Sequence, residues 1–390
     1  MRIAYLTTCS PIPAASGHSL RVFANWQAMR RIATVDLYAF DTRLPLTLRR
    51  DCRDLAITTL PARRESRRAL LARHLKAFFR GEGMMYAKAI SPRRTARLAA
   101  ELRARRTDLL VLGDTWLAGL LPALRHAAHR VVVDTHNVES RLYRRILAEQ
   151  SWRERVKTLL YWRNVIALER HLREADAVWC VSGTDARIYR EDLGLARVAV
   201  LPNAIDTDAY RPADLVDVAT SRSVVGEVPA IVFTGSYGYW PNATAALHLI
   251  DLARRLAAAG VAHRVCLVGR DPTAAMRAAA ADVPWVIITG AVPDVRPWIA
   301  GAALVVAPLT SGSGTKYKVL EALAMAKAVV TTPIGAEGLD LVDGTHAAIA
   351  PDLDALYGRV RRLIADPVTC ARLGRAGRAW VDATHSPTAL

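Results

Sequence analysis

The chain has 390 residues, of which 52% are hydrophobic and 23% are charged. This is the composition of a folded globular protein, and the length indicates about two domains, each long enough to bury a core. The formal net charge of +17 indicates an anionic partner, such as nucleic acid, anionic lipid or a phosphorylated substrate. Alternatively, arginine enrichment in a GC-rich genome explains part of this excess of positive charge.

Five cysteines are scattered along the chain, and none of them forms a C-x-x-C pair. This spacing argues against both a zinc site and a disulfide framework. Cys180 and Cys266 fall in strand-like runs, where we expect small core residues. A reducing cytoplasm is the simplest compartment. Residues 1–8 are typical of a first strand rather than a signal peptide, and no uncharged apolar run reaches the ~18–20 residues of a membrane span.

Strand-like and helical patterns alternate through the first half of the chain. Residues 20–32 form the first helical pattern, and the predicted strands are residues 2–8, 35–40, 56–60, 108–113, 130–135, 177–182 and 198–202. Such alternation predicts a parallel, doubly wound sheet, in which ligands bind beyond the carboxyl ends of the strands. Ser182, at the end of one strand, is placed to cap the next helix.

Polar residues follow two of these strands. After the first strand, a proline-rich loop leads to Gly17, His18 and Arg21 at a helix start. After the fifth strand, the segment DTHNVE at residues 134–139 contains His136. Ligand contact is one interpretation of this histidine, and an ordinary loop or interface residue is the other.

Two stretches of the first half are strongly basic. Residues 60–106 carry fourteen arginines or lysines against three glutamates, with apolar side chains between them. A second stretch, residues 141–173, includes Trp152 and Trp162. Basic, partly apolar helices of this kind can lie on an anionic membrane surface. Solvated helix faces over a core are the alternative.

The second half of the chain repeats the alternation of strands and helices. We predict domains at residues 1–206 and 229–372, with a linker at residues 207–228. A terminal helix is predicted at residues 373–390, where it could return to the first domain. Strands of the second domain are predicted at residues 230–234, 265–268, 285–289, 304–308, 328–332 and 347–350. This pattern indicates a second Rossmann-like sheet.

A glycine loop, SGSGTK, opens the helix that follows residues 304–308. Glycines let the backbone approach a ligand closely, and the free N–H groups and dipole of a helix start favour an anion. Lys316 and Lys318 add positive charge, and the Glu321 carboxylate could accept hydrogen bonds from sugar hydroxyls. A diphosphate at the helix start and a ribose further along fit this layout. A flexible loop before a structural helix is the alternative.

Residues 303–338 resemble the donor-site segment of family 4 glycosyltransferases, which are retaining enzymes of the GT-B fold. Glu321 matches the second glutamate of the E-x(7)-E motif of that family, and residues 335–338 match its G-x-E-G turn. The first glutamate falls at Ser313, where one branch of the family carries a G-S-G-T loop. Residues 134–139 resemble the D-x-H-N-x-E segment of the family. Residues 201–206 resemble its P-N-G-[IV]-D turn, with Ala204 in place of the glycine.

The resemblance implies a GT-B fold of two Rossmann-like, doubly wound parallel-sheet domains facing a cleft, with the acceptor on the first and the nucleotide sugar on the second. It implies catalytic roles for His136, Glu321 and Ser313, and acceptor contacts by His18 and Arg21. The donor-binding residues that it implies are Gly17, Asn203, Gly235, Ser236, Arg270, Val292, Pro293, Gly314, Thr315, Lys316, Lys318 and Glu321.

One feature of the family is missing. Many members carry a basic Arg/Lys pair after the glycine of the earlier loop TGSYGYWPN, but no basic residue stands between Gly235 and Asn242 here. A diphosphate leaving group needs charge stabilisation worth several kcal/mol in a dry site. Backbone N–H groups of both loops are candidates to supply it, together with the side chains of Lys316, Lys318, Arg270 and Arg21.

The activity implied is transfer of a hexose from a UDP- or GDP-sugar to a lipid-linked saccharide or polysaccharide precursor, with retention of configuration. The resemblance implies no dependence on a bound metal, no D-x-D arrangement is placed for one in the sequence, and no other cofactor is expected. It also implies that no catalytic base pair is needed, because the departing diphosphate can take the proton of the acceptor. The protein would work in the cytoplasm, peripherally at the inner face of the plasma membrane.

Three alternatives remain open from the sequence. A nucleotide-sugar epimerase or hydrolase of the same fold would use the same donor pocket. A catalytically silent nucleotide-sugar-binding protein is favoured by Ser313 and by the missing basic pair. A nucleic-acid binder would explain the charge, but no recognition helix or RNP-like motif is visible, so no nucleic-acid partner is predicted.

Overall fold

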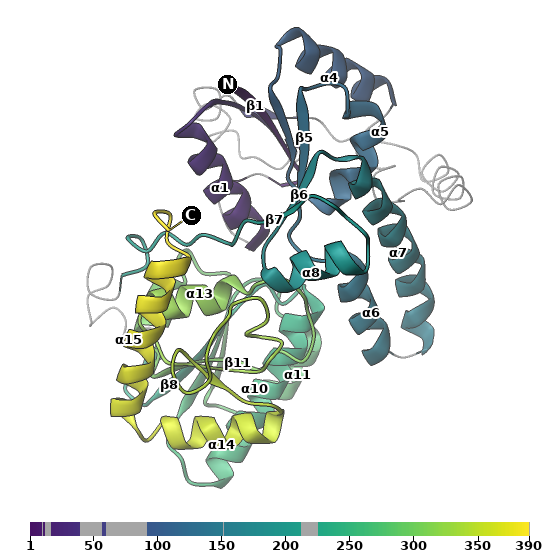
Figure 1. Ribbon diagram of the computed structural model, residues 1–390. Coiled ribbons are helices and arrows are strands. Elements are labelled where there is room, and N and C mark those ends of the chain that lie inside the picture. The colour runs from purple at the N-terminus through teal and green to yellow at the C-terminus, as the bar shows by residue number, and fades with distance from the viewer. Residues whose placement is uncertain are drawn as a thin grey trace. The chain divides into compact units, whose positions relative to one another are not determined.

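The computed structural model describes residues 1–9, 11, 17–39, 57–59, 92–150, 152–211 and 225–389. Most of the basic segment 60–106 and residues 212–224 of the predicted linker lie outside these ranges. The chain forms two compact units, Met1–Pro202 and Asn203–Leu390. Each unit is a parallel sheet with helices on both sides of it (Figure 1).

The sheet of unit 1 has seven strands among the described residues, in the order β3-β2-β1-β4-β5-β6-β7. All neighbouring strands are parallel. The strands are β1 (Arg2–Thr7), β2 (Thr34–Ala39), β3 (Ile57–Thr59), β4 (Leu109–Leu112), β5 (Arg130–Asp134), β6 (Ala177–Cys180) and β7 (Val198–Val200). Strand order reverses between β1 and β4, and ligands of such sheets bind at that point.

Helices connect these strands. They are α1 (Gly17–Arg30), α4 (Pro92–Ala104), α5 (Leu121–Leu124), α6 (Glu139–Glu149), α7 (Trp152–His171) and α8 (Gly183–Glu191), with 3₁₀ turns at η2 (Thr115–Leu120) and η3 (Leu172–Glu174). Ser182 caps α8 as predicted, because its hydroxyl accepts a hydrogen bond from the Asp185 N–H at 3.1 Å.

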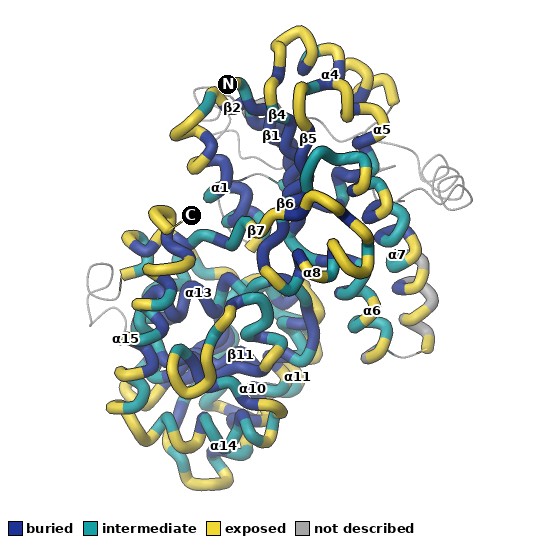
Figure 2. Tube along the Cα trace, in the orientation of Figure 1, coloured by how far each residue is buried: buried dark blue, intermediate teal, exposed yellow. Residues whose placement is uncertain are grey.

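Strand β1 is buried on both faces, as expected for the centre of a parallel sheet (Figure 2). Side chains alternate along the strand, so Ile3 and Tyr5 pack with Trp26 of α1 on one face. Ala4 and Leu6 belong to a second core that includes residues of α4, α5 and α8. This packing holds the carboxyl ends of β1, β4 and β5 in fixed positions.

The sheet of unit 2 has six strands among the described residues, in the order β10-β9-β8-β11-β12-β13, all parallel to their neighbours. The strands are β8 (Ala230–Thr234), β9 (Arg264–Val268), β10 (Val286–Gly290), β11 (Leu304–Ala307), β12 (Val329–Thr331) and β13 (Ala348–Ile349). Order reverses between β8 and β11, and each of these strands runs into one of the two glycine loops.

The helices of unit 2 are α10 (Trp240–Ala258), α11 (Ala274–Ala280), α12 (Arg296–Gly301), α13 (Tyr317–Ala324), α14 (Leu353–Leu363) and α15 (Pro367–Thr384). Pro241 stands in the first turn of α10, where proline is well tolerated because it needs no backbone N–H. The terminal helix α15 packs within this unit, where Arg378 donates hydrogen bonds to the carbonyls of Tyr210 (2.9 Å) and Thr207 (3.1 Å). A return of this helix to the first domain stays a prediction.

Two expectations from the sequence, on buried cysteines and on membrane spans, can be compared with the described residues. Cys180 and Cys266 are fully buried in β6 and β9, which confirms their predicted place in the core. None of the described helices combines the length and apolarity needed to cross a membrane.

Candidate functional site

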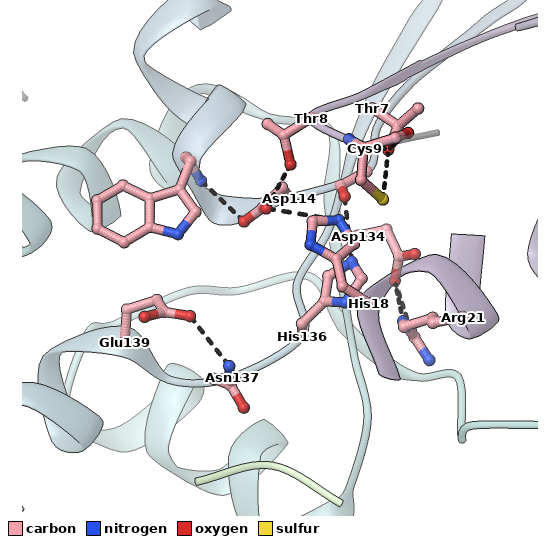
Figure 3. Close-up of polar contacts among 12 residues, drawn as sticks. Thr7, Thr8, Cys9, His18, Arg21, Asp114, Asp134, His136, Asn137 and Glu139 are labelled. Carbon is pink, nitrogen blue, oxygen red and sulfur yellow. Dashed lines mark hydrogen bonds and ion pairs between the residues drawn. The ribbon is translucent and has the colours of Figure 1, made fainter. Parts of the chain in front are cut away.

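Unit 1 gathers polar side chains beyond the carboxyl ends of β1, β4 and β5 (Figure 3). Because these strands are neighbours in the sheet, the residues that follow them meet at one edge. The imidazole rings of His18 and His136 lie 4.2 Å apart, measured between ring centroids, at an interplanar angle of 56°. Two residues predicted to contact ligands are therefore adjacent, although 118 positions separate them in the sequence.

Asp134 is the fixed point of this edge. Its carboxylate is fully buried and accepts hydrogen bonds from Arg21 Nε (3.1 Å), Asn25 Nδ2 (2.7 Å) and Tyr5 Oη (3.4 Å). Arg21 is 1% exposed and also donates through Nη1 to the Leu201 carbonyl at 2.9 Å. Its guanidinium is not presented to an acceptor, so this packing does not support the predicted acceptor contact. Arg21 instead positions residues 134–139.

The protonation of His136 follows from its surroundings. Its Nε2 lies 3.1 Å from the Gly113 carbonyl oxygen, which can only accept, so Nε2 carries the proton. Burial, together with the charges of His18 and Arg21, holds the pKa of His136 well below its usual range. A Cβ at position 113 would overlap the Tyr5 ring, so glycine is needed there. Because its pKa is lowered in this way, His136 is neutral. With the proton on Nε2, its Nδ1 carries none and can accept one hydrogen bond.

His18 has the opposite protonation state. Burial favours the neutral form, but a hydrogen bond with Cys9 and the charge of Asp114 raise the pKa of His18 to about 9. The Nε2 atom of His18 lies 3.6 Å from Asp114 Oδ2, and Asp114 also accepts from Thr8 Oγ1 at 3.0 Å. The edge thus pairs an imidazolium with a neutral imidazole.

A buried carboxyl group lies in the same region. Glu139 begins α6, is 6% exposed and accepts a hydrogen bond from Asn137 Nδ2 at 3.0 Å. Burial and the charge of Asp114 raise the pKa of Glu139 to about 8. Glu139 was not among the predicted site residues and entered only as the last residue of the segment DTHNVE. The sequence could have identified Glu139 as a candidate, because it stands in the first turn of a helix that follows a buried strand.

In unit 2, the loops after β8, β9 and β11 pack against one another. A Cβ on Gly235 would come within 3.0 Å of both Lys318 Nζ and Asn242 Nδ2. Gly269, with φ at 150°, lies so close to the Gly235 carbonyl that no Cβ fits. Predicted donor residues from three separate strands are thus brought to one edge of the sheet.

The loop after β11 is held in shape by its own side chains. Lys316 Nζ donates to the Ser313 carbonyl at 3.1 Å and to the Gly314 carbonyl, while Asn203 Nδ2 donates to Thr315 Oγ1. Within the described part of the chain, two buried hydroxyls of this loop find no hydrogen-bond partner, those of Ser311 and Ser313. Ser311 is 1% exposed. Because buried hydroxyls are costly to leave unpaired, a ligand is the expected partner.

Glu321 lies in α13, 8% exposed, and accepts a hydrogen bond from Tyr210 Oη at 3.0 Å. Burial raises the pKa of Glu321. Tyr210 was not among the predicted site residues, because 111 positions separate it from Glu321. The tyrosine fixes the position of one carboxylate oxygen, Oε1.

The remaining predicted donor residues lie in less enclosed places. Arg270 is 52% exposed and lies 3.7 Å from Asp271, and its Nε donates to Ser236 Oγ at 3.3 Å. Val292 and Pro293 follow β10 at the same edge of the sheet. Gly17, also predicted to bind the donor, belongs to unit 1 and begins α1. Within the described residues, no three His, Cys, Asp or Glu side chains are grouped to hold a metal ion.

Each unit thus has a Rossmann-like sheet with polar side chains at the edge where sheets of this kind bind ligands. The family model described as Glycosyltransferase Family 4 matches residues 14–209, and the model described as Glycosyl transferases group 1 matches residues 228–366. The chain therefore belongs to this glycosyltransferase family, as its resemblance predicted. No curated protein sequence matches it.

Solved structures show the same fold. Sucrose-phosphate synthase of Thermosynechococcus elongatus superposes with a TM-score of 0.73 at 16% identity, covering 100% of this chain and 96% of the synthase. Anabaena HepE, solved with UDP and glucose, gives a TM-score of 0.68 at 13% identity and covers 100% and 96%. A glycosyltransferase of Rickettsia africae gives 0.68 at 14% identity and covers 100% and 95%. The predicted GT-B fold is confirmed.

Proposed function

We propose that the protein transfers a hexose from a nucleoside diphosphate sugar to a saccharide acceptor, with retention of configuration. The observation that carries this proposal is the enclosed edge of unit 2. There, two glycine loops on adjacent central strands contact each other through Lys318 and Asn242, and two buried serine hydroxyls lack partners among the described residues. An anion and a sugar supply what these groups need.

The donor would lie along α13. Its diphosphate occupies the helix start, where N–H groups point at it, and its ribose hydroxyls donate to the Glu321 carboxylate held by Tyr210. UDP-glucose is the first donor to test, because Anabaena HepE was solved with UDP and glucose. We assign no metal to the reaction.

The acceptor would bind to unit 1. The unprotonated Nδ1 of His136 can accept a hydrogen bond from a sugar hydroxyl, and the His18 imidazolium offers a positive charge beside it. In a retaining transfer the departing diphosphate takes the proton of the acceptor hydroxyl on the same face of the sugar. His136 then orients a substrate hydroxyl and need not carry the proton itself.

The test is a panel of UDP- and GDP-sugars with short saccharide and lipid-linked acceptors, with the anomeric configuration of the product read by NMR. We expect one donor to be consumed and its anomeric configuration to be kept. Consumption without any acceptor would instead support a hydrolase or epimerase of the same fold. Binding without consumption would support the silent binding protein that Ser313 and the missing basic pair favour.

A lipid-linked acceptor would place the protein at the inner face of the plasma membrane, in the synthesis of a surface polysaccharide. The second basic stretch supports this part of the proposal, because α7 exposes Trp152 (73%) and Leu159 (46%) beside exposed arginines such as Arg155 and Arg163. Salt-dependent retardation of DNA would favour a nucleic-acid partner in its place.

A further inference from the structure

Several basic side chains of unit 2 could supply positive charge to the donor diphosphate. A diphosphate that departs from a sugar develops negative charge, and fixed cations stabilise it best in a water-excluded site. The loop after β8 provides none, because no basic residue stands between Gly235 and Asn242. Basic side chains of the described loops at this edge are those of Lys316, Lys318, Arg270 and Arg296.

Three of these side chains are committed elsewhere. Lys316 folds back on the carbonyls of its own loop. Arg296 forms an ion pair with Asp294 at 2.7 Å and donates to the Ala209 carbonyl at 3.2 Å. Arg270 is half exposed beside Asp271, where solvent screens its charge.

Lys318 differs from them in position. It begins in the first turn of α13, after the second glycine loop, yet its ammonium reaches the first loop. Nζ donates to Asn242 Oδ1 at 2.6 Å and lies 3.9 Å from the centroid of the Phe233 ring. Asn242 in turn donates through Nδ2 to the Ser236 carbonyl at 2.9 Å. The ammonium therefore lies beneath Gly235, at the junction of the two loops.

We propose that Lys318 is the cation that binds the donor diphosphate, and that it does so from helix α13 in place of basic residues in the loop after β8. This inference depends on the proposed function of the same site. Gly235 explains how the charge reaches the ligand, since a Cβ there would come within 3.0 Å of Nζ and separate it from anything bound above the loop.

Protonation of Lys318 gives the proposal an independent readout. Burial lowers the pKa of Lys318 to about 7, with the nearby charge of Glu321 raising it and that of Lys316 lowering it. The other groups packed against Nζ, Asn242 of α10 and Phe233 of β8, do not titrate. Glu321 is held by Tyr210, and the Arg270–Asp271 pair lies across the Gly235 loop in solvent.

A bound diphosphate favours the charged ammonium. At pH 8 the empty site is mostly neutral, so binding must take up close to one proton, and affinity must fall as pH rises above about 7. Nucleoside binding carries no such linkage, because it adds no negative charge.

The experiment is calorimetric titration of wild type, Lys318→Met and Lys327→Met with UDP, GDP and their nucleosides. Lys327 is a matched control, because its pKa is also lowered by burial while its Nζ donates to Ala302, next to the opposite end of β11. We expect Lys318→Met to weaken diphosphate binding by about 10- to 100-fold and to leave nucleoside binding nearly unchanged. Lys327→Met should bind as wild type does.

Titrations of the wild type at pH 8 in two buffers of different ionisation enthalpy then count protons without any variant. Uptake of about one proton with the diphosphate supports the proposal. No uptake, or equal losses for diphosphate and nucleoside in a folded Lys318→Met protein, would overturn it. Failure of the proposed function looks different, because the wild type would then bind neither UDP nor GDP.

Discussion

The ligand-binding edges of the two sheets are built on the same topology but leave their polar groups in different states. In unit 1, the charge of Asp134 is neutralised from within by Arg21, and both side chains are almost completely buried. In unit 2, the hydroxyls of Ser311 and Ser313 lack partners among the described residues, and the partly buried Lys318 places its ammonium beside Gly235 of a glycine loop. Buried polar atoms without a hydrogen-bond partner also occur in unit 1, at His18 Nε2 and Thr115 Oγ1, so the edges differ mainly in charge. The first edge pairs its buried carboxylate with an arginine of its own, whereas the second places hydroxyls and an ammonium beside glycine loops, where an anion can bind.

This contrast gives a physical reason for dividing the work between the units. The first edge holds a neutral histidine and an imidazolium in fixed places, which suits recognition of an uncharged sugar hydroxyl. The second edge offers N–H groups, hydroxyls and a cation, which suits a diphosphate. Substitutions at the two edges should therefore have different effects. Those in unit 1 should mainly lower stability, and those in unit 2 should mainly weaken ligand binding.

The largest expected effect is on the stability of unit 1. Asp134→Asn removes the carboxylate that forms an ion pair with the buried guanidinium of Arg21. We expect the free energy of unfolding of unit 1 to fall by about 3–5 kcal/mol. Denaturant unfolding measures it, with Asp36→Asn as control, since Asp36 pairs at 3.4 Å with the partly exposed Arg2 and Arg105. The control should lose less than about 1 kcal/mol. Equal losses in both variants would mean that the buried Arg21–Asp134 pair contributes no more to stability than a partly exposed ion pair does.

The next effect is on donor use by unit 2. Glu321→Ala removes the carboxylate proposed to accept the ribose hydroxyls, and we expect nucleotide release from the donor to fall by about 100-fold or more with the fold intact. Tyr210→Phe keeps the carboxylate and removes only its 3.0 Å hydrogen bond, so its loss should be smaller. Near-normal turnover in a folded Glu321→Ala protein would refute the assignment of the donor site.

A pH titration sharpens the comparison further. The pKa of Glu139 is raised to about 8 in the folded chain, so unfolding releases a proton between its ordinary value and pH 8. The stabilisation is complete at acid pH and is lost as pH rises through about 8, at up to about 1.4 kcal/mol per pH unit. Glu139→Gln should flatten this dependence in unfolding curves recorded at several pH values. An unchanged slope would place the titrating group elsewhere.

The smallest effect concerns the helical hairpin of α6 and α7. We expect co-sedimentation with vesicles of anionic lipid that fades as salt is added, and a further decrease of a few fold for Trp152→Ala. Binding to neutral vesicles at the same level would contradict the electrostatic account.

The alternation of strands and helices made the two parallel sheets predictable, because buried strands in such sheets form continuous apolar runs flanked by helices. Residues after the strands could also be assigned to the ligand-binding edge. Helix limits shifted by a few residues, as for α1, expected at 20–32 and found at Gly17–Arg30.

The pairings within the site could not be predicted in the same way. Tyr210 with Glu321 and Arg21 with Asp134 join residues 111 and 113 positions apart, and their contacts depend on how whole elements pack. The family resemblance implied an acceptor contact for Arg21, but a sequence does not show whether an arginine faces solvent or a buried carboxylate. Lys318 was one candidate cation among several until its reach to Asn242 distinguished it.

The measurement that tests the central claim most directly is calorimetric titration of UDP and GDP into the wild-type protein and Glu321→Ala. The account predicts micromolar binding of one nucleotide to the wild type, with proton uptake at pH 8, and strongly reduced binding to the variant. No binding of either nucleotide to the wild type would contradict the claim that the edge of unit 2 is a nucleoside diphosphate site.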